Sequence, residues 1–235
     1  TRVRSSAASD VYKRQVLDLI FSFPMPIILA LLLNEIRVKW FKRTTQTLLY
    51  LPHFLSWVVI GAVAYQMFAT QSGVVNALIA NAGKSPIPFL QEDGWWLFSY
   101  VLIGVWQTMG WGTIIYLAAI TNVNSELYEA AKVDGANRWQ QCLHVTLPCI
   151  RSTIVVMLIM QLGKLMGGSF ERIVALSNAK ATEFTTTIPV LVYKWFQGNK
   201  FSESTALGLF QSVIGVILVI ASDRVAKKLG EDGLL

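Results

Sequence analysis

Five long apolar stretches constrain this chain of 235 residues more than any other feature of its sequence. Each is close to the roughly 20 residues that an α-helix needs to cross about 30 Å of hydrocarbon. Only helices and closed barrels satisfy every backbone hydrogen bond inside a bilayer. The pattern therefore predicts an all-α, polytopic transmembrane helix bundle, with spans at 16–33, 48–69, 95–120, 152–169 and 205–222.

The composition supports a membrane protein and argues against a soluble one. Hydrophobic residues make up 54% of the chain and charged residues only 14%, which is too few ions to cover the surface of a soluble domain. The net charge is +6, but the basic residues lie in short clusters beside the apolar stretches and not along one soluble face. We therefore expect a lipid membrane as a partner and no nucleic acid.

The basic residues also predict which connections face the cytoplasm. If the connection 34–47 is cytoplasmic, ten Lys and Arg residues lie inside and five lie outside, which agrees with the positive-inside rule. The segments 121–151 and 223–235 then lie inside as well. The C-terminus is expected to be cytoplasmic, and 71–94 and 170–204 are expected to be outside.

The first fifteen residues do not fit this topology. They would lie outside although they carry four basic residues. We interpret 1–15 as a non-native or disordered leader, and we expect one further span before it in the natural protein. Residues 16–235 are predicted to form a single transmembrane domain.

Neither a metal site nor a nucleotide site is evident in the sequence. Cys142, His144 and Cys149 share one polar connection, but their spacing matches no standard zinc site, so we expect reduced thiols and no metal. A Gly-Lys-Ser triplet occurs at 83–85, yet Leu78 stands where a phosphate-binding loop needs its first glycine. We expect no cofactor in this chain, and any ATP hydrolysis must belong to another polypeptide.

The polar connection 121–151 predicts two short helices joined by a turn. Asn124 or Ser125 can cap the first helix. Gly135 allows a backbone turn that a side chain would hinder. The second helix is expected over 136–144, and it should stop at Pro148, where the fourth span begins.

Within this connection the residues resemble the EAA loop of permease subunits in binding-protein-dependent ABC importers. The shared pattern is a Glu-Ala-Ala triplet, a glycine four residues after the second alanine, and a terminal Val-x-Leu-Pro where the family has Ile-x-Leu-Pro. The segments PIILALLLNEIR, QTLLYLPHFLSWVV and GWGTIIYLAAI resemble the polysaccharide and complex-sugar branch of the same family. The loop residues that we assign to the pattern are Glu129, Ala130, Ala131, Asp134, Gly135, Leu147 and Pro148.

The resemblance implies a fold, a function and a set of partners. The fold is that of a type I ABC importer permease, with five spans present of an expected six. The function is to carry a carbohydrate, an oligosaccharide or polysaccharide fragment, across the bacterial cytoplasmic membrane. The EAA loop would move with an ATPase, and this chain would have no catalytic residues. The implied partners are a second permease subunit, two ATPase subunits, and an extracellular solute-binding protein that docks on 71–94 and 170–204.

Polar and aromatic side chains on the third and fourth spans are candidates for the substrate pathway. Aromatic faces pack on the C–H faces of sugars, while amides bond to the hydroxyls. A lysine inside a membrane is expected to face protein or water. Core packing remains an alternative for the two aromatic residues, and Trp95 and Trp96 are interpreted as interfacial anchors. The candidates are Tyr100, Gln107 and Trp111 on the third span, and Gln161 and Lys164 on the fourth.

Three other functions fit this sequence less well. An ion-coupled secondary transporter, the main alternative, usually needs titratable carboxylates inside its spans, and only Asp18 qualifies. A membrane-embedded enzyme needs paired acids, a His cluster or a nucleophile at a common depth, and the sequence shows none of these. A purely structural subunit would have no use for an EAA loop.

Overall fold

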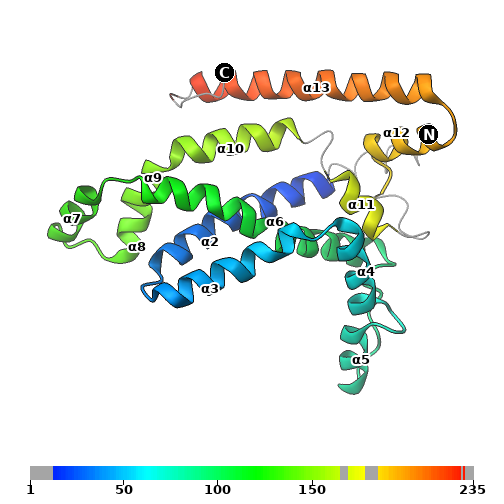
Figure 1. Cartoon of the computed structure of the whole chain (residues 1–235), viewed down its shortest axis with the longest axis horizontal. Coiled ribbons are helices and arrows are strands. Elements are labelled where there is room, and N and C mark those ends of the chain that lie inside the picture. The colour runs from blue at the N-terminus through cyan, green and yellow to red at the C-terminus, as the bar shows by residue number, and fades with distance from the viewer. Residues whose placement is uncertain (1–12, 165–168, 178–184, 229, 231–235) are drawn as a thin grey trace.

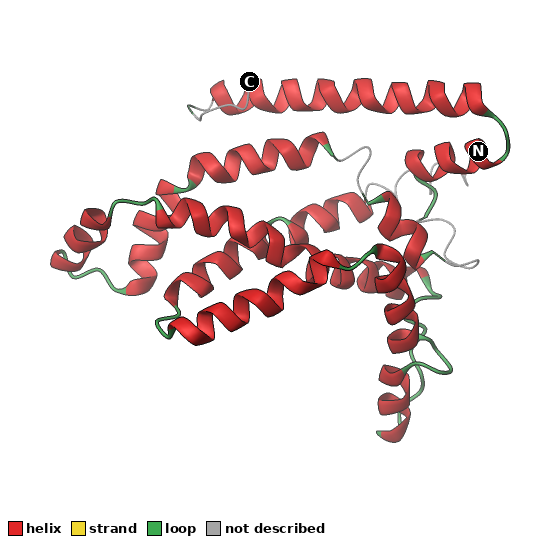
Figure 2. Ribbon diagram, in the orientation of Figure 1, coloured by secondary structure: helices red, strands yellow, loops and turns green. Residues whose placement is uncertain are grey.

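The computed structural model describes residues 13–164, 169–177, 185–228 and 230, and every regular element in those ranges is helical (Figure 2). Three helices are long and apolar enough to cross a membrane alone. The number rises to five when each of two bent helix pairs is counted as one span. The polytopic all-α fold is therefore confirmed.

The first, third and fifth predicted spans are each one long helix. The first begins at Lys13, three residues before its predicted start, and the first twelve residues of the expected leader lie outside the described ranges. The three helices are Lys13–Glu35, whose second part is α2 (Pro24–Glu35), α6 (Asp93–Thr121) and α13 (Phe201–Lys228).

The second predicted span, 48–69, is wrong as a single helix. Its axis turns by 102° between two helical parts. The expected cytoplasmic connection 34–47 is also wrong in extent, because most of it is helical and only 36–38 separate it from α2. The elements found here are α3 (Lys39–Tyr50), a 3₁₀ helix (Leu51–Phe54) and α4 (Trp57–Phe68).

The sharp turn after α3 has a local cause. Pro52 has no N–H group with which to continue the α-helical hydrogen bonds, so the chain tightens into the 3₁₀ helix. Ser56 then begins α4, because its side chain accepts a hydrogen bond from the Val59 backbone N–H at 3.4 Å.

The fourth predicted span is shorter than expected and also begins with a bend. The helical axis turns by 62° at Ile150, and the last helix ends at Gly163, while 165–168 lie outside the described residues. The expected loop helix 136–144 is wrong in extent, since it becomes a wide π turn partway and helical structure continues past Pro148. The elements are α8 (Arg138–Gln141), the π turn (Cys142–Thr146), α9 (Leu147–Cys149) and α10 (Arg151–Gly163).

Two clusters of buried apolar side chains hold the bundle together, and α6 contributes to both. One cluster joins α2, α6 and Ile150, and it includes Leu33 and Tyr116. The other joins α4, α6, α11 and α12, and it includes Trp96 and Ile173. The remaining helices are α5 (Val74–Asn81), α7 (Ser125–Val133), α11 (Phe170–Leu176) and α12 (Ile188–Gln197).

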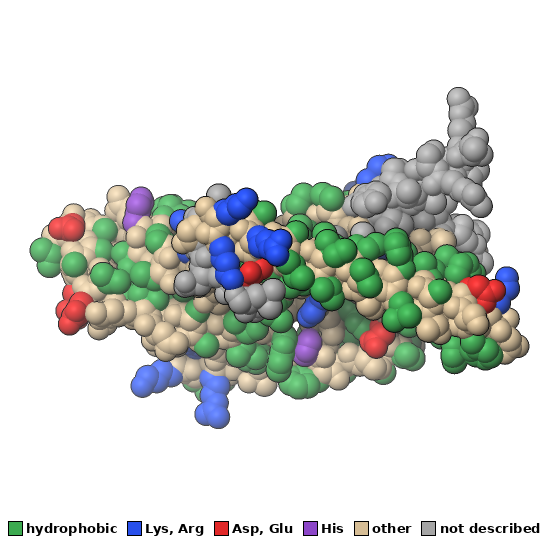
Figure 3. Space-filling view, turned by 90° about the horizontal axis from the view of Figure 1, so that it is seen from above, with side chains coloured by type: hydrophobic (Ala, Val, Ile, Leu, Met, Phe, Trp, Pro, Cys, Tyr) green, Lys and Arg blue, Asp and Glu red, His purple; other side chains and the backbone are tan. Residues whose placement is uncertain are grey.

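The outer faces of the helices are mostly apolar. Only 6% of the apolar window of α13 is buried inside this chain. Figure 3 shows hydrophobic side chains over much of one face of the molecule. In a membrane protein such faces contact lipid or other subunits.

The position of Trp96 shows that its interpretation as an interfacial anchor is wrong. The residue is fully buried and its indole Nε1 donates to the Leu176 carbonyl oxygen at 2.8 Å, so it is not an interfacial anchor. The reason is that α11 folds back over this end of α6, which the sequence does not reveal. Its neighbour Trp95 is 39% exposed.

The helices divide the molecule into two ends (Figure 1). α7, α8 and α9 lie at one end, and the C-terminal end of α13 lies on the same side. α4, α5 and α11 lie toward the opposite end. The two groups of candidate functional residues fall in different parts of this arrangement.

Candidate functional site

The first group lies in the connection between α6 and α10, which we call the coupling loop (121–151). Its first helix, α7, is capped by Asn124, whose side chain accepts a hydrogen bond from the Glu126 backbone N–H at 3.0 Å. The helix ends at a turn where Gly135 has a φ of +80°, a conformation that favours glycine. Both features agree with the sequence prediction.

Side-chain contacts fix the coupling loop to the spans behind it. Arg138 forms an ion pair with Glu35 at the end of α2. The Tyr128 hydroxyl and the Thr146 hydroxyl lie 3.0 Å apart and share a hydrogen bond. Asn137 begins α8 with a capping box, in which its side chain accepts from a backbone N–H at 2.9 Å. These contacts join α8 to α2 and α7 to the π turn that precedes α9.

The face of the coupling loop that carries the EAA pattern is open to contact. In this chain Val133 is 88% exposed and Trp139 is 69% exposed. Large exposed apolar side chains beside small ones are typical of a surface that binds another protein. Of the residues in the pattern, Glu129, Ala130, Asp134, Gly135 and Pro148 are exposed, while Ala131 and Leu147 are half-buried.

The second group lines two adjoining cavities inside the bundle. The larger cavity has a volume of about 410 Å³, within the size range of small-molecule sites. Its walls come from the first helix, the 3₁₀ helix, α4, α6, α10 and α11. The smaller cavity shares Asp18, Gln161, Lys164 and Ser169 with it.

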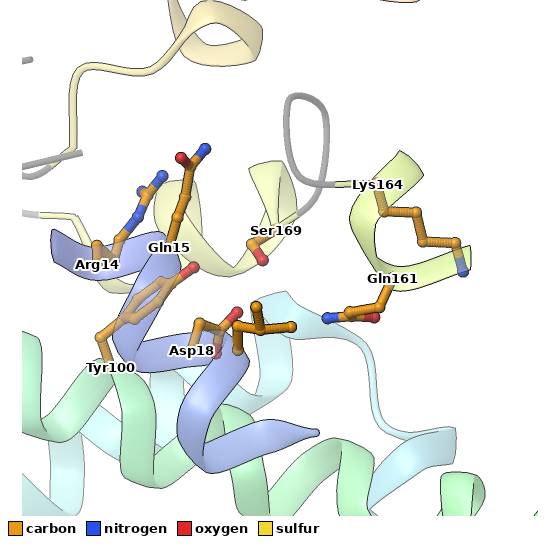
Figure 4. A pocket seen from close by; sticks show the side chains of 8 residues that line it. Arg14, Gln15, Asp18, Tyr100, Gln161, Lys164 and Ser169 are labelled. Carbon is orange, nitrogen blue, oxygen red and sulfur yellow. The ribbon is translucent and has the colours of Figure 1, made fainter. Parts of the chain in front are cut away.

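All five side chains that the sequence nominates for the substrate pathway line these cavities. Gln107 and Trp111 face the larger one, Tyr100 faces the smaller one, and Gln161 and Lys164 face both. Figure 4 shows Gln161 and Lys164 on α10, across the smaller cavity from the first helix and α6. The tertiary structure thus brings together the candidate side chains of the third span and those of the fourth span, which lie about fifty residues apart in sequence.

An aromatic wall lies along the larger cavity. The rings of Trp111 and His53 are stacked, with centroids 4.7 Å apart and an angle of 8° between their planes. Trp111 remains 46% exposed, which leaves part of its ring available to a bound molecule. His53, which the sequence does not nominate, reaches this position because the 3₁₀ helix turns it toward α6.

A buried arginine closes the other side of the cavity. The Arg172 guanidinium Nη2 donates to Asp18 Oδ2 at 2.5 Å, to the Tyr100 hydroxyl at 2.7 Å and to Ser169 Oγ at 3.0 Å. The side chain of Arg172 is only 4% exposed, and its guanidinium carbon lies 3.9 Å from the centroid of the Tyr100 ring. We call Arg172, Asp18 and Tyr100 the arginine cluster.

Gly104 makes room for the arginine cluster on α6. A Cβ atom at this position would lie 1.5 Å from Arg172 Nη1, so a side chain here would force the guanidinium out of its observed position. The candidate side chains on α6 therefore have two different roles. Tyr100 is 1% exposed and packs against Arg172 as well as Trp96, whereas Trp111 keeps an open face.

Sequence reasoning missed the arginine cluster, although one signal pointed to it. Asp18 is the only carboxylate within a predicted span, and a carboxylate inside a membrane requires a cationic partner. Arg172 was assigned to an outer connection by the charge pattern, but it is buried, because α11 turns inward.

Comparison with known proteins identifies the family. Residues 22–230 match the model of the binding-protein-dependent transport system inner membrane component. The chain is 45% identical over 219 residues to the polygalacturonan/rhamnogalacturonan transport system permease protein YteP of Bacillus subtilis (strain 168), covering 93% of this chain and 68% of that protein. It is 42% identical over 219 residues to protein LplB of the same organism, covering 93% and 69%.

A solved structure shares the fold. The chain superposes with a TM-score of 0.93 on a chain from the crystal structure of a bacterial alginate ABC transporter in complex with an alginate pentasaccharide-bound periplasmic protein. The sequences are 34% identical, and the match covers 100% of this chain and 82% of that one.

The chain belongs to the family of binding-protein-dependent transport system inner membrane components. It is a multi-pass permease subunit of the inner membrane and is of the ABC importer type. The coupling loop resembles the EAA loop of such permeases. The ion-coupled secondary transporter is not favoured, because these relatives are ABC permeases.

Proposed function

We propose that this permease forms part of the pathway by which an ATP-driven importer carries a carbohydrate, an oligosaccharide or polysaccharide fragment, across the bacterial cytoplasmic membrane. The observation that carries the proposal is the cavity inside an ABC permease fold, with an aromatic wall and amide side chains on facing helices. One relative is named for polygalacturonan and rhamnogalacturonan transport, and the structural neighbour is an alginate transporter.

The substrate pathway in this proposal runs through the larger cavity. The exposed face of Trp111 packs on a sugar ring, and the Gln107 and Gln161 amides bond to its hydroxyls. Tyr100 acts mainly by positioning Arg172, since its own ring is buried. Lys164 stands at the end of α10, where it contributes charge to both cavities.

Transport in this proposal is driven by two ATPase subunits, which bind and hydrolyse ATP, so this chain needs no cofactor of its own. The coupling loop docks on one ATPase through α7. Small side chains at Ala130 and Ala131 allow close approach, and Glu129 offers a charge. Arg138 connects the loop to α2, and Tyr128 connects α7 to the π turn that leads into α9 and α10, so closure of the ATPases would tilt these helices together.

The remaining partners are a second permease subunit, which completes the pathway, and an extracellular solute-binding protein, which docks on 71–94 and 170–204. In this topology the C-terminus is cytoplasmic. Two observations support the orientation: the C-terminal end of α13 lies toward the same end of the molecule as α7 and α9 (Figure 1), and Lys227 and Lys228 occupy its last turn.

Site-directed crosslinking tests the proposal. Both native cysteines, Cys142 and Cys149, are free and are first replaced by serine. A single cysteine then replaces Glu129, and a matched control replaces Lys84, which is exposed in the segment 71–94. In a reconstituted transporter that imports an oligosaccharide, position 129 should crosslink to an ATPase subunit and position 84 should not. Import without any adduct from position 129 would refute the coupling role.

A further inference from the structure

Three charged side chains line the larger cavity among the described residues: Asp18, Lys164 and Arg172. Two are cations and one is an anion, so the cavity carries one excess positive charge. The smaller cavity is also lined by Arg14, so the described residues of the two adjoining cavities together include three cations and one carboxylate. A cavity of this sign attracts negatively charged solutes.

Arg172 does not supply the free charge. Its guanidinium is 2.5 Å from Asp18 and also donates to Tyr100 and Ser169, so the buried arginine and the half-buried aspartate neutralise each other. The pair joins α11 to the first helix and α6, and it stays in place without a ligand. The charge that remains in the larger cavity is therefore that of Lys164.

Lys164 lies near the pair but takes no part in it. Figure 4 shows its amine turned away from Asp18. The side chain is exposed, and no ion pair involving it occurs within the part of the chain that the structure describes. It follows α10, whose 13 residues rise about 20 Å, less than the roughly 30 Å of a hydrocarbon layer, so a span that begins at the start of α10 would leave the lysine inside that layer. A lysine at such a depth favours a negatively charged partner.

We infer that the carbohydrate carried by this permease bears carboxylate groups, as uronic acid residues do, and that Lys164 is the residue that selects them. This inference rests on the proposed function. The Trp111 and His53 wall takes the apolar face of a pyranose, the glutamine amides take its hydroxyls, and the Lys164 amine pairs with the carboxylate. A neutral sugar gains nothing from the lysine.

The test compares two probes that differ only at their carboxyl groups, which are ionised in one and methyl-esterified in the other. The complete transporter, reconstituted in vesicles with its binding protein outside and ATP inside, is given radiolabelled trigalacturonate or the fully methyl-esterified trisaccharide. Lys164→Gln should lower the ratio of acidic to esterified uptake about tenfold. Lys164→Arg should keep the ratio, and so should Lys84→Gln at an exposed lysine outside the cavities. The binding protein is the same throughout, so its own preference cancels.

A second measurement removes the binding protein altogether. Trigalacturonate is titrated into the detergent-purified transporter, and its affinity should fall about tenfold in Lys164→Gln but not in Lys84→Gln. Unchanged ratio and unchanged affinity in Lys164→Gln would overturn the inference while leaving the carbohydrate importer intact. Import of neither probe by the wild-type transporter would overturn the proposed function and the inference with it.

Discussion

The coupling loop and the arginine cluster are held together by opposite kinds of interaction. In the loop, the capping contacts of α7 and α8 join residues a few positions apart, such as Asn124 and Glu126, while the longer-range pair of Arg138 with Glu35 is exposed. In the cluster, Arg172 contacts Asp18, which is 154 positions away, and Tyr100, which is 72 positions away. The loop is a local structure with an exposed face, whereas the cluster exists only when several helices have packed.

This difference predicts that the two regions fail in different ways. Changes in the loop should impair contact with the ATPase and leave the bundle intact. Changes in the cluster should loosen the bundle itself, because a buried charge would lose its partner.

The largest effect is expected from Arg172→Met. The substitution keeps an apolar stem but leaves the Asp18 carboxylate without its cation, which should destabilise the fold by about 3 kcal/mol or more. Uptake should fall to background, and the melting temperature in detergent, followed by fluorescence-detected size exclusion, should drop. The double variant Asp18→Asn with Arg172→Gln should recover part of the stability. A single variant with normal melting would show that the pair is not structural.

The next largest effect is expected from Gly135→Leu, on ATPase binding and uptake but not on the melting temperature. A φ of +80° strains a leucine by about 1 kcal/mol, so the turn after α7 should change shape. Co-purification of the ATPase should fall about tenfold, while melting stays close to that of the wild type. Gly83→Leu is the matched control, because Gly83 has a φ of +74° and equally open surroundings but lies in 71–94. Equal losses of ATPase from both variants would contradict the assignment of the coupling loop.

A smaller effect on stability than that of Arg172→Met is expected from Gly104→Ala. The added methyl group would overlap Arg172 Nη1, so the guanidinium must move, at a cost of about 1–3 kcal/mol. Melting should drop by less than in Arg172→Met, and uptake should fall in parallel. Gly94→Ala, on the same helix with no atom within 4 Å of the new methyl group, should behave as wild type. If Gly104→Ala is as stable as its control, the guanidinium is not fixed against α6.

The smallest effect is expected from Tyr128→Phe. It removes one half-buried hydrogen bond, between α7 and Thr146, worth about 1 kcal/mol. Coupling should weaken, seen as less uptake per ATP hydrolysed, while total ATPase binding is retained. Tyr193→Phe removes an exposed hydrogen bond from Gln197 and serves as control. A loss of ATPase binding in Tyr128→Phe would mean that the tyrosine contacts the partner and not only the loop.

The sequence predicted the spans unequally, and the reason is visible at particular residues. The helices Lys13–Glu35, Asp93–Thr121 and Phe201–Lys228 follow from long apolar runs without a break. The second and fourth spans are bent pairs, because Pro52 stops α3 and the chain turns at Ile150. The apolar composition of a segment shows how many consecutive residues favour lipid. It does not show whether the helix axis bends within that segment.

The candidate site divides in the same way. The side chains of Tyr100, Gln107 and Trp111 could be chosen from the sequence, because helical spacing alone places them on one face of α6. Their partners could not be chosen. His53 meets Trp111 only through the 3₁₀ turn, and Trp96 is buried only because α11 covers it.

The sequence by itself determined the three long spans, the cap of α7 and the glycine turn that follows it, since apolar length, helix capping and a turn depend on neighbours in the chain, and its motifs resemble those of permeases. Only the tertiary structure decided that Asp18, Tyr100 and Arg172 meet, and that Lys164 is left without a partner among the described residues. Buried charges are paired according to how helices pack in three dimensions, and packing between distant segments leaves no periodic signal in one sequence.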